Sequence, residues 1–152
     1  MAVSDLLEHY TGLTVAETIR DAALLSSLTL QIEGVPTIPE TTEEWLVLRL
    51  PSIKRMPARK GKWRGYVEIE VSCCSREALK RTDKKENQHW YLASLVRAAL
   101  ESAAVLDVKE YGTSAEETVA TMSLGEGSMS LSSSKGVNTV VVAIPGYIVE
   151  AE

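Results

Sequence analysis

The apolar residues of this chain alternate most regularly with their neighbours between Arg64 and Cys73. Val67, Ile69 and Val71 fall with Cys73 on one side of an extended backbone. Successive side chains of a strand point to opposite faces of a sheet, so this period of two predicts a strand with one buried face.

Shorter patterns of the same kind predict further strands at Leu28–Ile32, Glu44–Leu50, Val105–Tyr111, Met129–Ser134 and Asn138–Ile144. Pro145-Gly146 bounds the last of these, which is rich in β-branched residues and is expected to be well buried. Thr118–Leu124 stays open between a strand and a helix, because Ser114–Glu117 has the form of a capping box.

Helical spacing of apolar residues predicts an amphipathic helix from about Asn87 to Ala104. The first 28 residues predict two shorter helical pieces separated at Thr11-Gly12. The second piece is expected to start at Thr14–Glu17, because a threonine followed three residues later by a glutamate is typical of a capped helix start.

This order of elements predicts an α+β fold, with a mainly antiparallel sheet of about four to six strands and helices packed on one face. A chain of 152 residues is the usual size of one domain, so residues 1–152 are expected to form a single domain. The order shows no alternation of strands and helices, which argues against a parallel nucleotide-binding sheet.

The composition, 45% hydrophobic and 24% charged, is that of an ordinary folded protein. The longest aliphatic run, Val140–Ile144, is far shorter than the roughly 20 residues that cross a bilayer, so no membrane contact is expected. The N-terminus lacks the pattern of a secretory signal, which predicts that the chain stays in the cytoplasm where it is made.

Little in the sequence indicates catalysis, a metal site or a cofactor. Cys73 and Cys74 are expected to be reduced thiols, one buried and one on the solvent side, because neighbouring strand residues point apart. The two histidines, His9 and His89, have no zinc-motif spacing. The Gly- and Ser-rich residues 125–136 lack a phosphate-loop pattern and predict a mobile hairpin.

Charge is distributed unevenly along the chain. Residues 54–85 hold eleven Lys/Arg against four Asp/Glu, a charge of +7, while the other positions hold five against seventeen, a charge of −12. Part of this segment is predicted to be a long basic loop at residues 52–63, between two strands. The candidate contact residues in and beside this loop are Lys54, Arg55, Arg59, Lys60, Lys62 and Arg64.

Three interpretations of the basic loop remain open. It is a solvated loop, or it contacts nucleic acid without reading its sequence, or it binds an acidic protein. Trp63 and Tyr66 lie nearby and offer aromatic surfaces on which bases can stack, so the second interpretation gives an alternative function for the chain, a small nucleic-acid-binding module.

The strand Trp63–Val71, the polar linker after it, the amphipathic helix Trp90–Ala103 and the late strands together resemble the tail terminator proteins of long-tailed bacteriophages, the lambda-like minor tail protein U group. The resemblance covers most of the chain. This chain differs from the lambda-like members in the length and basicity of its loop and in residues 125–136.

The resemblance implies a structural virion protein without enzymatic activity. Proteins of that group form a hexameric ring that caps the tail tube, ends tail growth and joins the tail to the neck connector of the head. The implied partners are other copies of the chain, the tail tube protein, a head-completion or neck connector protein, and DNA that passes through the ring without sequence-specific contacts. The implied location is the virion, at the neck end of the tail.

Overall fold

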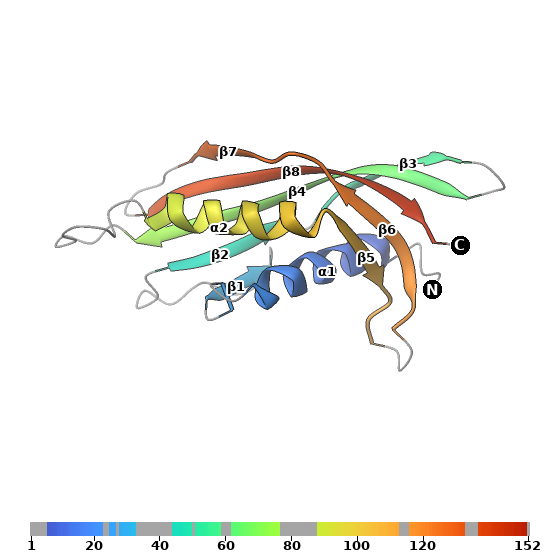
Figure 1. Ribbon diagram of the computed structural model, residues 1–152, viewed down its shortest axis with the longest axis horizontal. Helices are drawn as coiled ribbons and strands as arrows, with labels where there is room; N and C mark the ends of the chain where they lie inside the picture. The colour runs from blue at the N-terminus through green and yellow to red at the C-terminus, as the bar shows by residue number, and fades with distance from the viewer. Residues whose placement is uncertain are drawn as a thin grey trace.

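The structure is a computed structural model that describes residues 6–22, 25–26, 28–32, 44–49, 51–58, 62–76, 88–112, 116–132 and 137–151. Within these ranges the elements are, in chain order, α1 (Leu7–Asp21), β1 (Thr29–Ile32), β2 (Glu44–Arg49), β3 (Ile53–Pro57), β4 (Trp63–Arg76), α2 (Gln88–Ala103), β5 (Val105–Lys109), β6 (Thr118–Leu124), β7 (Ser128–Leu131) and β8 (Val137–Glu150). The eight described strands form one sheet that curls as a half-barrel around the helices (Figure 1).

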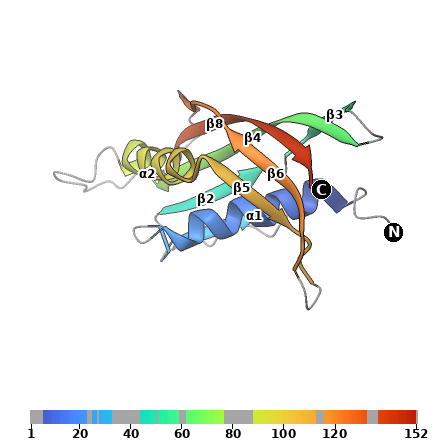
Figure 2. The ribbon, with the colours of Figure 1, turned by 45° about the vertical axis from the view of Figure 1, so that its right-hand side comes forward.

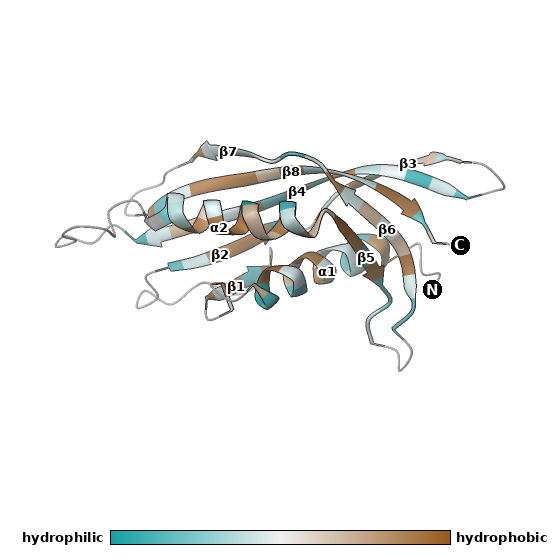
Figure 3. Ribbon diagram, viewed as in Figure 1, coloured by the Kyte–Doolittle hydropathy of each residue, from teal (hydrophilic) through white to brown (hydrophobic). Residues whose placement is uncertain are grey.

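The two longest strands, β4 and β8, pair antiparallel at the centre of this sheet over thirteen residue pairs, from Arg64↔Val149 to Arg76↔Val137. The inner face of β4 is buried at Val67, Ile69, Val71 and Cys73, as the alternation predicts. The inner face of β8 is equally apolar, and Figure 3 shows hydrophobic residues along most of its length. This ladder therefore supplies the middle of the core.

Both central strands change their outer neighbour at the same place. On the edge that faces away from β8, β4 pairs with β3 up to Val67 and with β2 from Glu70. On the edge that faces away from β4, β8 pairs with β7 up to Ala143 and with β6 from Gly146. The residues at which β4 and β8 have no further strand beside them pair with each other, as Glu68↔Pro145 and Ile69↔Ile144. The sheet is therefore two lobes that share the β4–β8 ladder, one completed by β3, β6 and β5 and the other by β2, β1 and β7.

The helices lie inside the curl of the sheet (Figure 2). α2 packs on β4 and β8, while α1 contacts β5 in one lobe and β2 in the other, and also packs against α2. The predicted α+β class and mainly antiparallel sheet hold, but the expectation of four to six strands is wrong, because the described residues form eight. The helix packing also differs from the expectation of helices on one face, because the sheet curls around the helices. The sheet is also mixed, because β1 and β2 pair in parallel.

The N-terminal region forms one helix rather than two pieces. Thr11 and Gly12 are buried inside α1, and the Thr14 hydroxyl donates to the carbonyl oxygen of Tyr10 at 2.9 Å instead of capping a new helix. Packing of this helix against the core overrides the local stop and start signals, which is common because tertiary contacts supply most helical stability.

The predicted loop at residues 52–63 is wrong over its first half. Ile53–Pro57 is β3, an edge strand that pairs with the start of β4, and Arg59 and Lys60 lie outside the described residues. Gly65 makes this pairing possible, because a Cβ atom there would lie only 2.7 Å from the carbonyl oxygen of Lys54.

β8 continues through Pro145-Gly146, where the sequence predicts that it ends. The carbonyl of Pro145 accepts a hydrogen bond from the N–H of Gly125 at 2.8 Å. The N and C=O of one strand residue point to the same edge of the strand. The nitrogen of Pro145, which lacks a hydrogen, therefore faces Gly125 and not β4. Pro145 thus costs the central ladder no hydrogen bond.

The turn between β6 and β7 is fastened to α2. A carboxylate oxygen of Glu101 accepts the N–H of Gly127 at 2.8 Å and the Nε–H of Arg97 at 2.9 Å. These two bonds lower the pKa of Glu101, the bond from Gly127 more strongly. Of the segment predicted to be a mobile hairpin, residues 125–132 are therefore held on the sheet, and 133–136 lie outside the described residues.

The remaining elements follow the predictions within a few residues. α2 matches the predicted helix, and Thr118–Leu124 is a strand, which resolves the alternative left open there. No helix among the described residues is long and apolar enough to span a membrane.

The end of α2 gives a test of backbone strain. Ala104 follows the helix with φ of 55°, a left-handed conformation that glycine adopts more easily. We expect Ala104→Gly to raise the free energy of unfolding by about 1 kcal/mol, measured by urea denaturation. The control Ser94→Gly, at an exposed position inside α2, should lower it by a similar amount. Destabilisation by both changes would contradict this account.

Candidate assembly surface

The outer, convex side of the central ladder carries the side chains that alternate with the core residues. On this side Tyr66 faces Tyr147, and Ser72 faces Val141. The two described helices both lie on the other side of the sheet, so aromatic and aliphatic groups stay open to solvent here. Tyr66 is 57% exposed and Val149 is 38% exposed. Exposed apolar groups that gather on one face are typical of an interaction surface.

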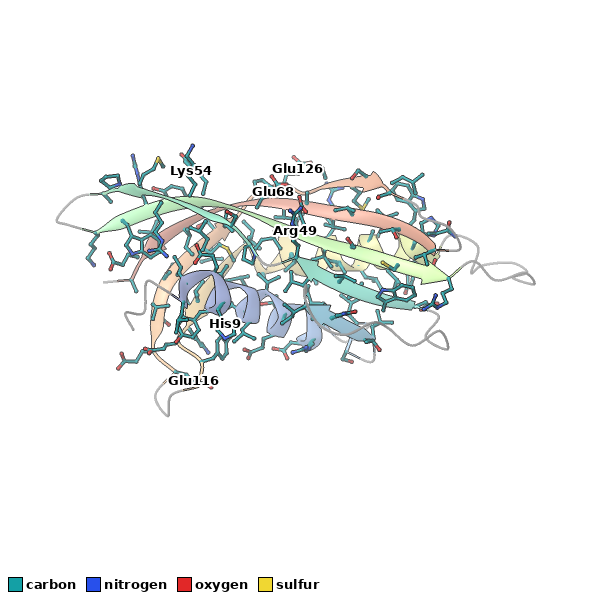
Figure 4. The ribbon with its side chains drawn as sticks, turned by 180° about the vertical axis from the view of Figure 1, so that it is seen from behind. His9, Arg49, Lys54, Glu68, Glu116 and Glu126 are labelled. Carbon is teal, nitrogen blue, oxygen red and sulfur yellow. The ribbon has the colours of Figure 1, made fainter. Side chains whose placement is uncertain are left out.

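A group of cations and aromatic rings occupies the end of this side where β3 pairs with the start of β4, which we call the β3–β4 hairpin. Lys54 stands opposite Tyr66 and Met56 opposite Arg64, so Lys54 and Arg64 are diagonal neighbours on one face of β3 and β4. The ring of Tyr66 packs against that of Tyr147 with 5.5 Å between centroids. Both cations are exposed. We call Lys54, Met56, Arg64, Tyr66 and Tyr147 the hairpin patch; Figure 4 labels Lys54 on this hairpin.

Two of the other predicted contact residues are held within the chain. The guanidinium of Arg55 points to the inner side of the hairpin, 3.7 Å from the carboxylate of Glu8 and 5.6 Å from the ring centre of Trp63. The ammonium of Lys62 donates to the carbonyl oxygen of Ala151 at 3.2 Å. The structure thus brings Lys54 and Arg64 together on the outer side. Contact of the predicted residues with a partner stays a prediction.

The sequence interpretation missed Met56 and Tyr147. Tyr147 lies beyond Pro145-Gly146, where the strand is predicted to have ended. The available signal is the alternation of Tyr147, Ile148 and Val149, in which only Ile148 is fully buried. Followed through the proline, that period of two places Tyr147 and Val149 on the outer face.

A second surface of distinct chemistry lies between α1 and β5. It is a groove of about 250 Å³ lined by Thr14, Glu17, Thr18, Asp21, Val105, Leu106, Asp107, Lys109 and Tyr111. Three carboxylates outnumber its one ammonium group, so we call it the acidic groove. Asp21 and Asp107 are exposed, and Val105 is 54% exposed.

One hydrogen bond fixes the two walls of the acidic groove. The hydroxyl of Tyr111 donates to a carboxylate oxygen of Glu17 at 2.6 Å, and its oxygen lies 3.4 Å from the hydroxyl of Thr14. Burial and the bond to Glu17 raise the pKa of Tyr111, so the phenol stays protonated at neutral pH. The phenol therefore adds no charge to the groove.

The two cysteines are poor candidates for chemistry. Both are buried, so the expectation that one faces solvent is wrong. Cys74 points outward but is covered, because it stands opposite Trp45, whose ring carries the guanidinium of Arg76 at 4.8 Å. Burial raises the pKa of both thiols. Within the described residues there is no group of three or more His, Cys, Asp or Glu that would hold a metal ion.

Comparisons with known proteins show a shared fold. No protein-family model matches the chain, and a search of curated proteins also finds no match. Among solved structures, a chain from the virion of a native gene transfer agent particle is similar over 99% of this chain and 98% of that one, with a TM-score of 0.56 and 13% identity. A second, named only by a sequence identifier, is similar over 100% and 99%, with a TM-score of 0.55 and 12% identity.

Lys54 and Arg55 are neighbours on β3 whose side chains point to opposite sides of the sheet, and this difference can be tested by mutation. We expect Arg55→Ala to lower the free energy of unfolding by about 1 kcal/mol, chiefly through the lost contact with Trp63, because an exposed ion pair such as that with Glu8 contributes little. Lys54→Ala, on the outer side, should change it by less than about 0.5 kcal/mol. If urea denaturation shows the same loss of unfolding free energy for both variants, the two side chains do not lie on opposite sides of β3 as described.

Proposed function

We propose that this chain is a structural protein of a phage-like virion and, more specifically, a tail terminator. The observation that carries the proposal is the match of the complete fold to a chain of a gene transfer agent virion, end to end in both chains. The same order of strand, linker and helix underlies the resemblance to tail terminators. The proposed role is assembly and includes no catalysis.

In this proposal several copies form a closed ring, with six copies as in the lambda-like group. The ring caps the tail tube protein on one side and meets a head-completion or neck connector protein on the other. DNA passes through its lumen without sequence-specific contacts. The open outer face of the sheet and the hairpin patch are surfaces that such contacts need, and the cations Lys54 and Arg64 suit a neighbour of negative charge.

Ring formation tests this proposal directly. Purified protein is examined by negative-stain electron microscopy and sedimentation velocity over a series of concentrations, alone and mixed with the tail tube protein of the same particle. We expect closed rings, with a mass that is a whole multiple of 16.6 kDa when the chain assembles alone. A protein that stays monomeric in every one of these conditions contradicts the proposal.

The second candidate function is nucleic-acid binding by the hairpin patch itself. It is favoured by two exposed cations beside the exposed ring of Tyr66, because cations neutralise phosphates and aromatic rings stack on bases.

This candidate predicts salt-dependent binding to single-stranded DNA, measured by fluorescence anisotropy from about 50 to 200 mM salt. Replacing both Lys54 and Arg64 by Ala should weaken binding and reduce the slope of log K against log salt by up to about 2. The control Arg20→Ala, at an exposed position on α1, should leave the slope nearly unchanged. Absence of binding at the lowest salt concentration rejects this candidate.

A further inference from the structure

We propose that copies of this chain associate head to tail, with the hairpin patch of one copy docked on the acidic groove of the next. The inference rests on the ring proposed above and names the two surfaces that close it. The occupant of the acidic groove is thus a second copy of the same chain.

Charge is the first argument. The chain carries a net charge of −5, so identical copies repel one another unless the contact brings unlike charges together. The basic window of residues 54–85 is the part with a strong positive balance, and the remaining positions are acidic. A favourable contact between copies therefore pairs this window with a different, acidic surface. Such complementarity guides encounter and fixes orientation.

Symmetry gives the second argument. A ring of more than two copies uses a heterologous interface, in which two different patches of one chain meet. The hairpin patch comes from β3, β4 and β8, whereas the acidic groove comes from α1, β5 and the residues just after β5. The two surfaces share no residue, so one copy can use both at once.

The side chains of the two surfaces also match in kind. Lys54 and Arg64 are exposed cations, and Asp21 and Asp107 are exposed carboxylates at the groove. Val105, 54% exposed beside Asp107, offers an apolar contact for Met56 or Tyr66 of the neighbour. Lys109 is the one groove cation, and it is outnumbered by the three carboxylates.

Both surfaces are formed before the copies meet. The Tyr111–Glu17 hydrogen bond ties the segment after β5 to α1, and the close approach at Gly65 sets the β3–β4 pairing. Preformed surfaces bind with little loss of conformational freedom, so a modest contact between copies suffices.

The test uses two charge-reversed variants of the full chain. The first carries Lys54→Glu and Arg64→Glu, which makes the hairpin patch acidic. The second carries Asp21→Lys and Asp107→Lys, which makes the groove basic. Each variant then presents two surfaces of like charge, and we expect each alone to require at least about tenfold higher concentration for assembly than the unmodified chain. Assembly is measured by sedimentation velocity, and folding is checked by circular dichroism.

An equal mixture of the two variants is the decisive measurement. In the mixture, the acidic hairpin of the first meets the basic groove of the second, and the basic hairpin of the second meets the acidic groove of the first. We expect assembly to return, with the two variants alternating. A single chain with all four changes should also assemble. The control Arg20→Glu alters an exposed charge that lines neither surface and should leave assembly unchanged.

The outcomes separate this inference from the function on which it rests. If the unmodified chain forms rings and the reversed variants form them equally well, the docking pair is wrong and the hairpin patch serves another partner, while the ring proposal stands. Loss of assembly in both variants without recovery in the mixture also overturns the pairing. If the unmodified chain never assembles, the ring proposal and this inference both fail.

Discussion

The pairing of β4 with β8 is the constraint on which the rest of the structure depends. Thirteen consecutive residue pairs fix which side chains of both strands face inward. Because the side-chain period is two, that register determines the core and the open outer face together. Every other described strand joins the sheet through β4 or β8, directly or through one neighbour. The helices then fill the concave side that the ladder leaves apolar.

Much of this framework could be predicted from the sequence, because β4 and α2 have strong periodic patterns of their own. β3 could not, since its alternation is hidden by charge: Lys54 and Arg55 are both cations, yet they point to opposite sides. The continuation of β8 was hidden by Pro145. This proline breaks no hydrogen bond of the β4–β8 ladder, because its nitrogen faces the side of β8 away from β4. In α1, buried Gly12 resembles a helix break until its packing is known.

The candidate surface shows the same limit. Composition identifies a basic segment, but it does not tell which of the Lys and Arg side chains lie on the outer face of the sheet. That depends on how strands distant in sequence pair with one another. Tyr147 joins Tyr66 only because residues about eighty positions apart in sequence stand opposite each other. The acidic groove likewise brings α1 together with residues on and just after β5, and no local pattern announces it. Surfaces of this kind are therefore properties of the fold more than of any motif.

The division of the sheet into two lobes has a consequence for how such a chain tolerates change over evolutionary time. A one-residue deletion within β4 would move every residue on one side of the deletion to the opposite face of that strand, so that stretch could no longer keep both its buried residues and its pairing with β8. The same deletion in β3 would disturb only a five-residue edge strand. Chains that share this fold are thus expected to differ most in the flanking strands and least in the β4–β8 ladder.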